Sequence, residues 1–204
     1  MTLQLAVMAS GRGSNLQAVI EAIDAGRLDA HVVMVLANKA DAYALTRAKE
    51  RGIPAVFLDP KAYGTREDYD RAAAAQLRQA GAEALLLAGY MRIVTASLIN
   101  AFAGRVLNIH PSLLPSFPGL HAQRQALDYG VRYSGCTVHF VDEGLDSGPI
   151  ICQAVVPVEP GDTEATLAAR ILTEEHRILP EALQLIAQGR VTVTGRRVEI
   201  QPAQ

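Results

Sequence analysis

Residues 3–25 read LQLAVMASGRGSNLQAVIEAIDA, and this run carries the clearest sign of the architecture. Its apolar beginning, Leu3–Met8, leads through the turn sequence Ser10-Gly11-Arg12-Gly13-Ser14-Asn15 into Leu16–Ala25, which has the composition of a helix. An apolar strand that passes through a glycine-containing turn into a helix is typical of α/β proteins. The run therefore predicts the first strand and the first helix of an α/β fold.

The same alternation of strand, turn and helix continues as far as Pro111. We expect further buried strands at Val32–Ala37, Ala55–Leu58, Ala84–Ala88 and Val106–Ile109. Helices are expected at Ala42–Arg51, Thr65–Gln79 and Thr95–Ala101. Continuous apolar strands separated by helices indicate a parallel sheet that is covered on both faces.

The pattern changes after Pro111. Tyr133–Val141 and Pro149–Val158 are rich in β-branched residues and are joined by a Gly/Asp loop, residues 142–148. We expect them to join the same sheet, with antiparallel pairing as one option. A long helix is predicted to begin at a cap formed by Asp162, and Pro180 should kink or break it because proline lacks an N–H group. A small hairpin is expected around residues 191–200.

Length and composition favour one self-sufficient domain. The chain has 204 residues, half of them hydrophobic, which is enough for a core without a disulfide or a metal. We therefore do not expect the change near residue 111 to separate two independent cores. The 19 basic and 21 acidic residues argue against a broad nucleic-acid surface.

Cysteine usage and hydropathy predict a cytoplasmic protein. Cys136 and Cys152 are too far apart in sequence to form a CxxC pair, and such sparse usage fits a reducing interior. We find no apolar run of about 18–20 residues, the length that a membrane span needs. The first residues lack the basic segment of a secretion signal, so they are expected to form a strand.

The turn Ser10–Asn15 is the first candidate site. Two glycines, hydroxyl groups and a helix N-terminus together suit an anion such as a phosphate. Leu16 stands where the dinucleotide fingerprint GxGxxG requires its third glycine, and the Gly-Lys-Ser/Thr of a Walker A loop is missing. A mononucleotide-sized phosphate is thus favoured over NAD or ATP. The alternative is an ordinary turn in which Ser14 or Asn15 caps the helix.

The segment Val106–Pro111 is the second candidate. Asn108 and His110 are two residues apart in an expected strand, so their side chains project to the same face. Ligands of open α/β sheets bind beyond the carboxyl ends of strands, where this segment ends. An amide donor beside an imidazole suits acyl-type transfer, because the amide stabilises an oxyanion and the imidazole moves a proton. The alternative is that both side chains merely satisfy carbonyl groups of a turn.

Asp146, in the loop 142–148, is the third candidate. A carboxylate beside His110 would hold the imidazole in its cationic form and fix its orientation. The alternative is that the acidic residues of this loop only face solvent. His121 and His139 are weaker candidates, and His139 could equally be a solvent-facing or a hydrogen-bonded core residue.

Other kinds of catalysis find no support in the sequence. The metal-binding motif HExxH is missing, as is a cluster of cysteine and histidine, so we expect no metal. The sequence contains no GxSxG elbow for a serine nucleophile. Direct transfer of a group between two bound substrates is therefore favoured over a covalent enzyme intermediate.

The combined motifs resemble the folate-dependent formyltransferases. The resemblance rests on Asn108-Ile109-His110-Pro111-Ser112-Leu113-Leu114-Pro115 with Phe117-Pro118-Gly119, on Ala88–Ile93, and on Asp142–Ile150. The turn sequence Ser10–Gln17 resembles the phosphate loop of the family members that act in purine synthesis. The match extends to about Ile186. It implies a Rossmann-like fold with a phosphate-binding half (1–110) and a β-extended folate half (111–204).

The resemblance also implies a reaction and a set of site residues. The reaction is formyl transfer from 10-formyltetrahydrofolate to the glycine amine of a phosphoribosyl glycinamide, with no metal. The implied catalytic residues are Asn108, His110 and Asp146. The implied substrate-binding residues are Gly13, Ser14, Asn15 and Glu175. The implied folate-binding residues are Arg66, Met91, Arg92, Ile93, Val94, Asn108, Val141, Asp142 and Asp146.

Three positions depart from the family pattern: Arg12 replaces a small polar residue, Ser116 a lysine, and Leu172 a glutamine. Arg12 could add positive charge near a phosphate, whereas Ser116 and Leu172 are given no substrate role. The chain length also leaves no room for the extra RNA-binding or regulatory domains that other family members are expected to carry.

Two rival functions remain open. One is hydrolysis of the formylfolate, or transfer of its formyl group to a different amine. The other is a phosphate-binding regulatory module without chemistry. The expected partners are small molecules, with neither nucleic acid nor membrane, and the protein is expected to be a monomer or a homodimer.

Overall fold

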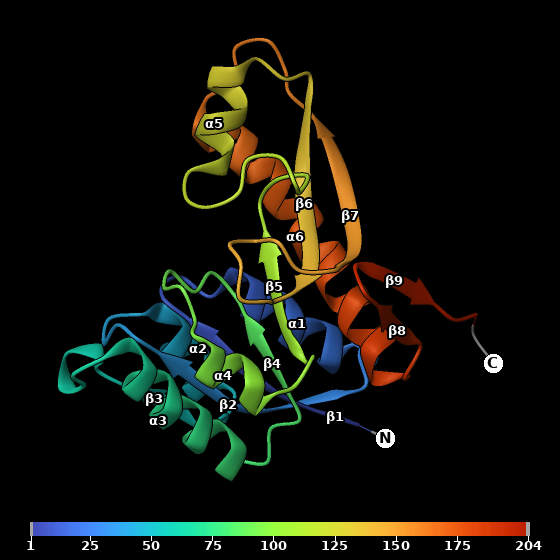
Figure 1. Ribbon diagram of the computed structural model, residues 1–204. Coiled ribbons are helices and arrows are strands. Elements are labelled where there is room, and N and C mark those ends of the chain that lie inside the picture. The colour runs from blue at the N-terminus through green and yellow to red at the C-terminus, as the bar shows by residue number, and fades with distance from the viewer. Residues whose placement is uncertain (1, 203–204) are drawn as a thin grey trace.

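The computed structural model describes residues 2–202, which form a sheet with helices on both faces (Figure 1). The strands are β1 Leu3–Ala9, β2 Ala30–Ala37, β3 Ala55–Phe57, β4 Ala84–Leu87, β5 Val106–His110, β6 Tyr133–Phe140, β7 Ile150–Pro157, β8 Val191–Thr194 and β9 Arg197–Ile200. The helices are α1 Ser14–Asp24, α2 Tyr43–Glu50, α3 Arg66–Gln79, α4 Ala96–Ala101, α5 Ala122–Tyr129 and α6 Glu164–Ala187, with a 3-10 turn at Pro60–Ala62.

The main sheet has seven strands in the order β3-β2-β1-β4-β5-β6-β7. The five strands from β3 to β5 are parallel, while β6 pairs antiparallel with β5 and β7 antiparallel with β6. The predicted mostly parallel sheet with mixed C-terminal strands is therefore confirmed, and so is the hairpin, now β8 and β9. The chain runs from β1 outward in one direction to β3 and then returns to β4 on the other side. The order of the strands thus reverses between β1 and β4, and α/β sheets bind ligands beyond the carboxyl ends of strands at such a reversal.

Three expectations about helices need correction. Thr163, not Asp162, caps α6, because its hydroxyl accepts the Thr166 N–H while Asp162 pairs with Arg170. Pro180 lies inside α6 without breaking it: the helix continues to Ala187. Helix α5 was not predicted at all, since its eight residues, AQRQALDY, contain only two buried positions, both alanine.

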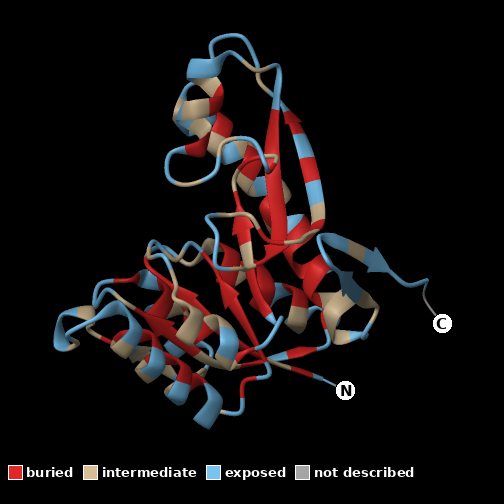
Figure 2. Ribbon diagram, in the orientation of Figure 1, coloured by how far each residue is buried: buried red, intermediate tan, exposed pale blue. Residues whose placement is uncertain are grey.

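Side chains on the two faces of the sheet enter two apolar clusters. From β1, Leu5, Val7 and Ala9 pack with α1, α2 and α6 on one face, whereas Ala6 and Met8 pack with α3 and α4 on the other. The inner strands β1, β2, β4, β5 and β6 are accordingly buried along most of their length (Figure 2). The first cluster joins residues from before and after Pro111, including Leu107 and Leu167.

None of the helices described between residues 2 and 202 combines the length and the apolar character needed to cross a membrane.

Candidate active site

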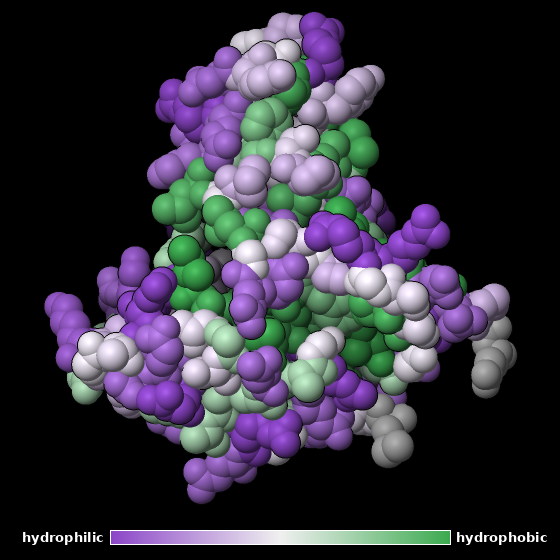
Figure 3. Space-filling view, in the orientation of Figure 1, coloured by the Kyte–Doolittle hydropathy of each residue, from purple (hydrophilic) through white to green (hydrophobic). Residues whose placement is uncertain are grey.

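The predicted site residues gather at the carboxyl ends of β1, β4 and β5, together with the loop that joins β6 to β7. Hydrophobic surface collects in the middle of the face shown in Figure 3, between the body formed by β1–β4 and the part that carries α5. The loops around this region contribute exposed apolar side chains: Met91, Ile93, Leu120 and Leu145. Exposed apolar groups beside a polar centre are typical of a small-molecule site.

The glycine turn after β1 leaves the N-terminus of α1 without a side-chain cap. Gly13 occupies the cap position in the left-handed conformation, with a φ of 69°. A Cβ atom at this position would lie 2.8 Å from the Cβ of Ala44, so close packing against α2 also requires glycine. The first N–H groups of a helix without such a cap can donate hydrogen bonds to a bound anion. The expected alternative, a helix capped by Ser14 or Asn15, is not observed.

Ser10 ties this turn to its neighbours. Its Oγ donates to Asn38 Oδ1 at 2.7 Å and accepts the N–H of Met91 at 2.8 Å. The end of β1 is thereby joined to the end of β2 and to the segment that follows β4. The glycine turn and the start of the Met91–Val94 segment consequently lie side by side.

Asn15 and Glu175 form a buried polar pair between α1 and α6. The Nδ2 atom of Asn15 donates to Glu175 Oε2 at 2.8 Å, and both residues are less than a tenth exposed. Burial raises the pKa of Glu175, although the hydrogen bond from Asn15 opposes this effect. The Oδ1 atom of Asn15 is buried without a hydrogen-bond partner. An unsatisfied buried acceptor beside a carboxyl group is suited to a substrate N–H or O–H group.

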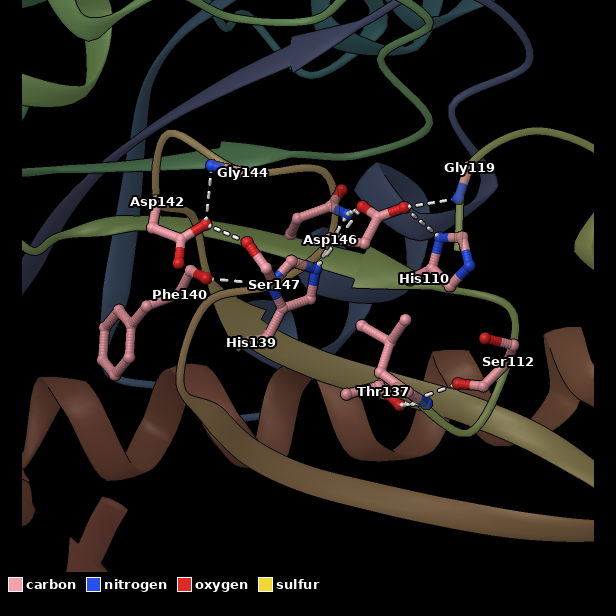
Figure 4. A network of polar contacts seen from close by, with 12 residues as sticks. His110, Ser112, Gly119, Thr137, His139, Phe140, Asp142, Gly144, Asp146 and Ser147 are labelled. Carbon is pink, nitrogen blue, oxygen red and sulfur yellow. Dashed lines mark hydrogen bonds and ion pairs between the residues drawn. The ribbon is translucent and has the colours of Figure 1, made fainter. Parts of the chain in front are cut away.

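His110 and Asp146 meet at the end of β5 (Figure 4), and Asn108 of the same strand lies beside Asp146. His110 Nδ1 lies 3.3 Å from Asp146 Oδ2, and the same oxygen accepts the N–H of Gly119 at 2.8 Å. Asn108 Nδ2 lies 3.5 Å from the other oxygen, Oδ1. The approach of Asp146 to His110, the step that spacing alone does not predict, is therefore present in the structure.

Both ring nitrogens of His110 face hydrogen-bond acceptors. Nδ1 faces the Asp146 carboxylate, and Nε2 lies 2.9 Å from the carbonyl oxygen of Phe117. Neither acceptor carries a proton to give, so each contact is a hydrogen bond only when the facing ring nitrogen carries the hydrogen. Asp146 itself has a φ of 49°, a left-handed conformation that aspartate tolerates better than most residues. The loop 142–148 thus turns its carboxylate back toward β5.

His139 belongs to this cluster more closely than its sequence context indicates. It lies on β6 directly opposite Asn108, and its Nε2 is 3.1 Å from Asn108 Nδ2 and 3.9 Å from Asp146 Oδ1. Only the pairing of β5 with β6 reveals this contact. His121, the other weak candidate, is exposed and lies 3.7 Å from Glu164 instead.

The predicted folate residues lie in several different surroundings. Arg92 lies over the ring of Tyr69 at 4.9 Å, while Val94 and Val141 pack against the same apolar cluster. The side chain of Asp142 forms hydrogen bonds within its own loop, where Oδ1 accepts from Gly144 N and from Ser147 Oγ. Arg66 is exposed at the first turn of α3, and no hydrogen bond within residues 2–202 joins it to the other site residues.

The exposed apolar groups and the polar ends of the strands fit a flat heteroaromatic co-substrate better than a metal ion. Among the residues that the structure describes, no group of three or more histidine, cysteine, aspartate or glutamate side chains is placed to hold a metal. The clustered groups are hydrogen-bond donors and one carboxylate, which suit stabilisation of a developing oxyanion.

The departures from the family pattern lie at the edges of the site. Arg12 is exposed, and its carbonyl oxygen accepts from Arg47 Nε. Ser116 contributes its backbone to a turn, in which its carbonyl accepts from Ser112 Oγ. Leu172 is half-buried on α6, one turn before Glu175. Within residues 2–202, no hydrogen bond or ion pair joins any of these three side chains to the cluster around Asp146.

The chain belongs to the formyl transferase family, whose sequence pattern matches residues 3–183. It is 45% identical over 189 residues to the phosphoribosylglycinamide formyltransferase of Escherichia coli K12, covering 93% of this chain and 89% of that protein. It is 50% identical to part of the trifunctional purine biosynthetic protein adenosine-3 of Drosophila pseudoobscura pseudoobscura, but spans only 14% of that protein.

The fold is shared with solved structures of the same kind. The crystal structure of glycinamide ribonucleotide transformylase 1 from Symbiobacterium toebii superposes with a TM-score of 0.97 at 52% identity, covering 98% of this chain and 95% of that one. These similarities confirm the predicted family and the predicted Rossmann-like fold.

Proposed function

We propose that this protein transfers the formyl group of 10-formyltetrahydrofolate to the glycine amine of a phosphoribosyl glycinamide, a step of purine synthesis. The observation that carries the proposal is the meeting of Asn108, His110 and Asp146 at the end of β5. Family membership and the relatives' names support the reaction class. In the proposed reaction the amine nitrogen bonds to the formyl carbon, the bond from that carbon to folate N10 breaks, and N10 gains the proton that the amine loses.

The proposed roles follow from the contacts of each side chain. An N–H of Asn108 and the protonated ring of His110 stabilise the negative charge that develops on the formyl oxygen. Asp146 holds His110 charged and oriented through the 3.3 Å contact. For the imidazole to reach the formyl oxygen through Nε2, the carbonyl of Phe117 must give up its 2.9 Å contact.

The two substrates are proposed to bind on either side of this centre. The phosphate lies on Gly13, Ser14 and Asn15 at the N-terminus of α1, and Glu175 binds the glycinamide part. The folate lies against Met91, Arg92, Ile93, Val94 and Arg66, with its pterin ring near Val141, Asp142 and Asp146. The exposed side chains of Met91 and Ile93 supply the apolar surface that a flat ring system needs.

We further propose that residues 1–204 act as one formyltransferase domain, with a phosphate-binding half to residue 110 and a folate half from 111. The single domain is supported by the apolar cluster to which both halves contribute residues. The proposed compartment is the cytoplasm, since Cys136 and Cys152 are both free thiols. The protein is proposed to act as a monomer or a homodimer.

The test is a transfer assay with the purified chain, following formylated glycinamide and released formate separately. We expect the formylated amine as product. Rapid formate release without the acceptor would instead identify a hydrolase. His110→Ala and Asp146→Asn should each lower turnover by ~10²-fold or more, the scale of lost electrostatic and acid–base assistance.

The control is His31→Ala, because His31 is exposed on β2 and has no assigned role. This variant should retain the parent's turnover. Parent-like turnover in both the His110 and the Asp146 variants would contradict the assigned roles. If the parent binds its substrates but transfers no formyl group, the result would favour a binding module without chemistry.

A further inference from the structure

The ring of His139 is buried beside the site, with 2% of its surface exposed. Its Nδ1 atom lies 2.8 Å from the carbonyl oxygen of Phe140, and its Nε2 atom lies 3.1 Å from Asn108 Nδ2. The register of β6 on β5 places His139 directly opposite Asn108. Each ring nitrogen therefore has one defined neighbour.

These two neighbours determine where the imidazole carries its proton. A carbonyl oxygen only accepts hydrogen bonds, so Nδ1 must carry a hydrogen. Burial lowers the pKa of His139, and His110 adds to this effect, while the Phe140 carbonyl, Asp146 and Asp142 oppose it. The lowered pKa favours the neutral ring, in which Nε2 presents a lone pair to Asn108.

The lone pair on Nε2 determines the orientation of the Asn108 amide. A side-chain amide can present either its oxygen or its NH₂ group, and only the NH₂ group satisfies an acceptor. One N–H of Asn108 is then held by His139, and the second makes only the long contact of 3.5 Å between Nδ2 and Asp146 Oδ1, which it must leave in order to face the formyl oxygen. The opposite orientation would place the amide oxygen where the proposed mechanism develops a negative charge.

We infer that His139 is a positioning residue, which orients the Asn108 amide so that an N–H donor, and not the carbonyl oxygen, faces the formyl group. The inference rests on the proposed function, since it assigns a use to the donor that His139 orients. The sequence suggested His139 only as a weak candidate with no partner, because the contact spans 31 positions of the chain.

The first test compares His139→Phe with His139→Gln in the transfer assay. Phenylalanine keeps the ring shape but has no acceptor, so kcat should fall by about tenfold or more, approaching the ~10²-fold cost of a lost oxyanion donor. Glutamine can place an oxygen near the position of Nε2 and should recover part of the loss. KM for both substrates should stay near the parent value, because the amide orientation matters mainly in the transition state.

A double-mutant cycle separates positioning from a general structural role. If His139 acts through Asn108, then His139→Phe should change kcat by no more than about twofold once Asn108 has been replaced by alanine. Full additivity of the two substitutions would overturn the inference, and so would parent-like kcat in His139→Phe alone. His31→Phe serves as the control for replacing a histidine that has no role in the site.

A spectroscopic measurement tests the inference without catalysis. The ¹⁵N NMR signals of the His139 ring should show a neutral imidazole with its proton on Nδ1, and the Asn108 NH₂ signals should shift in His139→Phe. A proton on Nε2 of the neutral ring would refute the orientation argument, whatever the activity. A parent that fails to transfer formyl groups would refute the proposed function instead. The NMR result would still show how His139 orients the amide of Asn108.

Discussion

At the scale of single residues, the buried pair of Asn15 and Glu175 is the most unusual feature of the site. A carboxyl group that is largely removed from water favours its protonated form, and Glu175 receives only one compensating hydrogen bond. A protonated Glu175 can donate as well as accept.

The raised pKa of Glu175 predicts how stability depends on pH. In the unfolded chain this carboxyl group loses its proton near pH 4.5, whereas in the folded protein it keeps the proton to a higher pH. Between these two values the folded state binds more protons than the unfolded state, so its contribution to stability falls as pH rises. The loss is complete once the pH exceeds the folded pKa.

Glu175→Gln should remove this contribution, because glutamine does not titrate. Urea unfolding at a series of pH values from 4 to 8 measures the difference between the variant and the parent. We expect Glu175→Gln to gain stability relative to the parent as pH rises from 4.5. A constant difference across the range would show that Glu175 has no raised pKa.

At the scale of secondary structure elements, the pairing of β6 with β7 determines where the loop 142–148 begins and ends. Gly135 sits opposite Val155 in this pair, and a Cβ atom at position 135 would lie 1.9 Å from the carbonyl oxygen of Ala154. It would also lie 2.8 Å from Cδ2 of Leu113, in the segment that follows His110. Only glycine at position 135 allows both β7 and the segment that follows His110 to approach β6 this closely.

Gly135→Ala should therefore lower the free energy of unfolding by about 1–3 kcal/mol, the usual cost of forcing extra atoms into a packed region. Chemical denaturation followed by circular dichroism measures the change. Gly11→Ala is the matched control, because nothing lies within 4 Å of a Cβ atom built at that position. Equal stability of Gly135→Ala and the parent would contradict the close approach of the two strands.

At the scale of the whole molecule, one apolar cluster extends across the change of pattern near residue 111. Leu107 and Ile109 of β5 belong to the same cluster as Val138 of β6 and Leu167 of α6. Helix α1 also depends on α6, which carries Glu175 against Asn15. The two halves of the chain therefore cover each other's apolar faces.

The full chain should accordingly unfold in a single transition, and a fragment of residues 1–110 should show no cooperative unfolding. Without β6 and α6 the fragment exposes one edge of β5 and the apolar face of α1, which removes a large part of the burial that stabilises it. Far-ultraviolet circular dichroism in increasing urea measures the unfolding of the full chain and of the fragment. A sharp transition in the fragment would show that the first half is an independent domain.

The elements that follow from local pattern were predictable from the sequence. The run of residues 3–25 predicts β1 and α1, and the apolar strands up to Ile109 predict the parallel part of the sheet, because their periodicity is local. The placement of Asn108 and His110 on one face also follows from two-residue spacing along a strand. The loop 142–148 offered Asp146 as a candidate, although its approach to His110 does not follow from spacing, and family resemblance alone supplied Glu175 as a site residue.

Tertiary structure alone decided the contacts that complete the site. The left-handed backbone of Asp146 turns its carboxylate to His110, and the register of β6 on β5 sets His139 against Asn108. Helix α5, with few buried residues of its own, and the unbroken path of α6 through Pro180 likewise depend on surroundings. The physical reason is that such contacts join positions tens of residues apart, through strand register and loop path, neither of which a local pattern of side chains specifies.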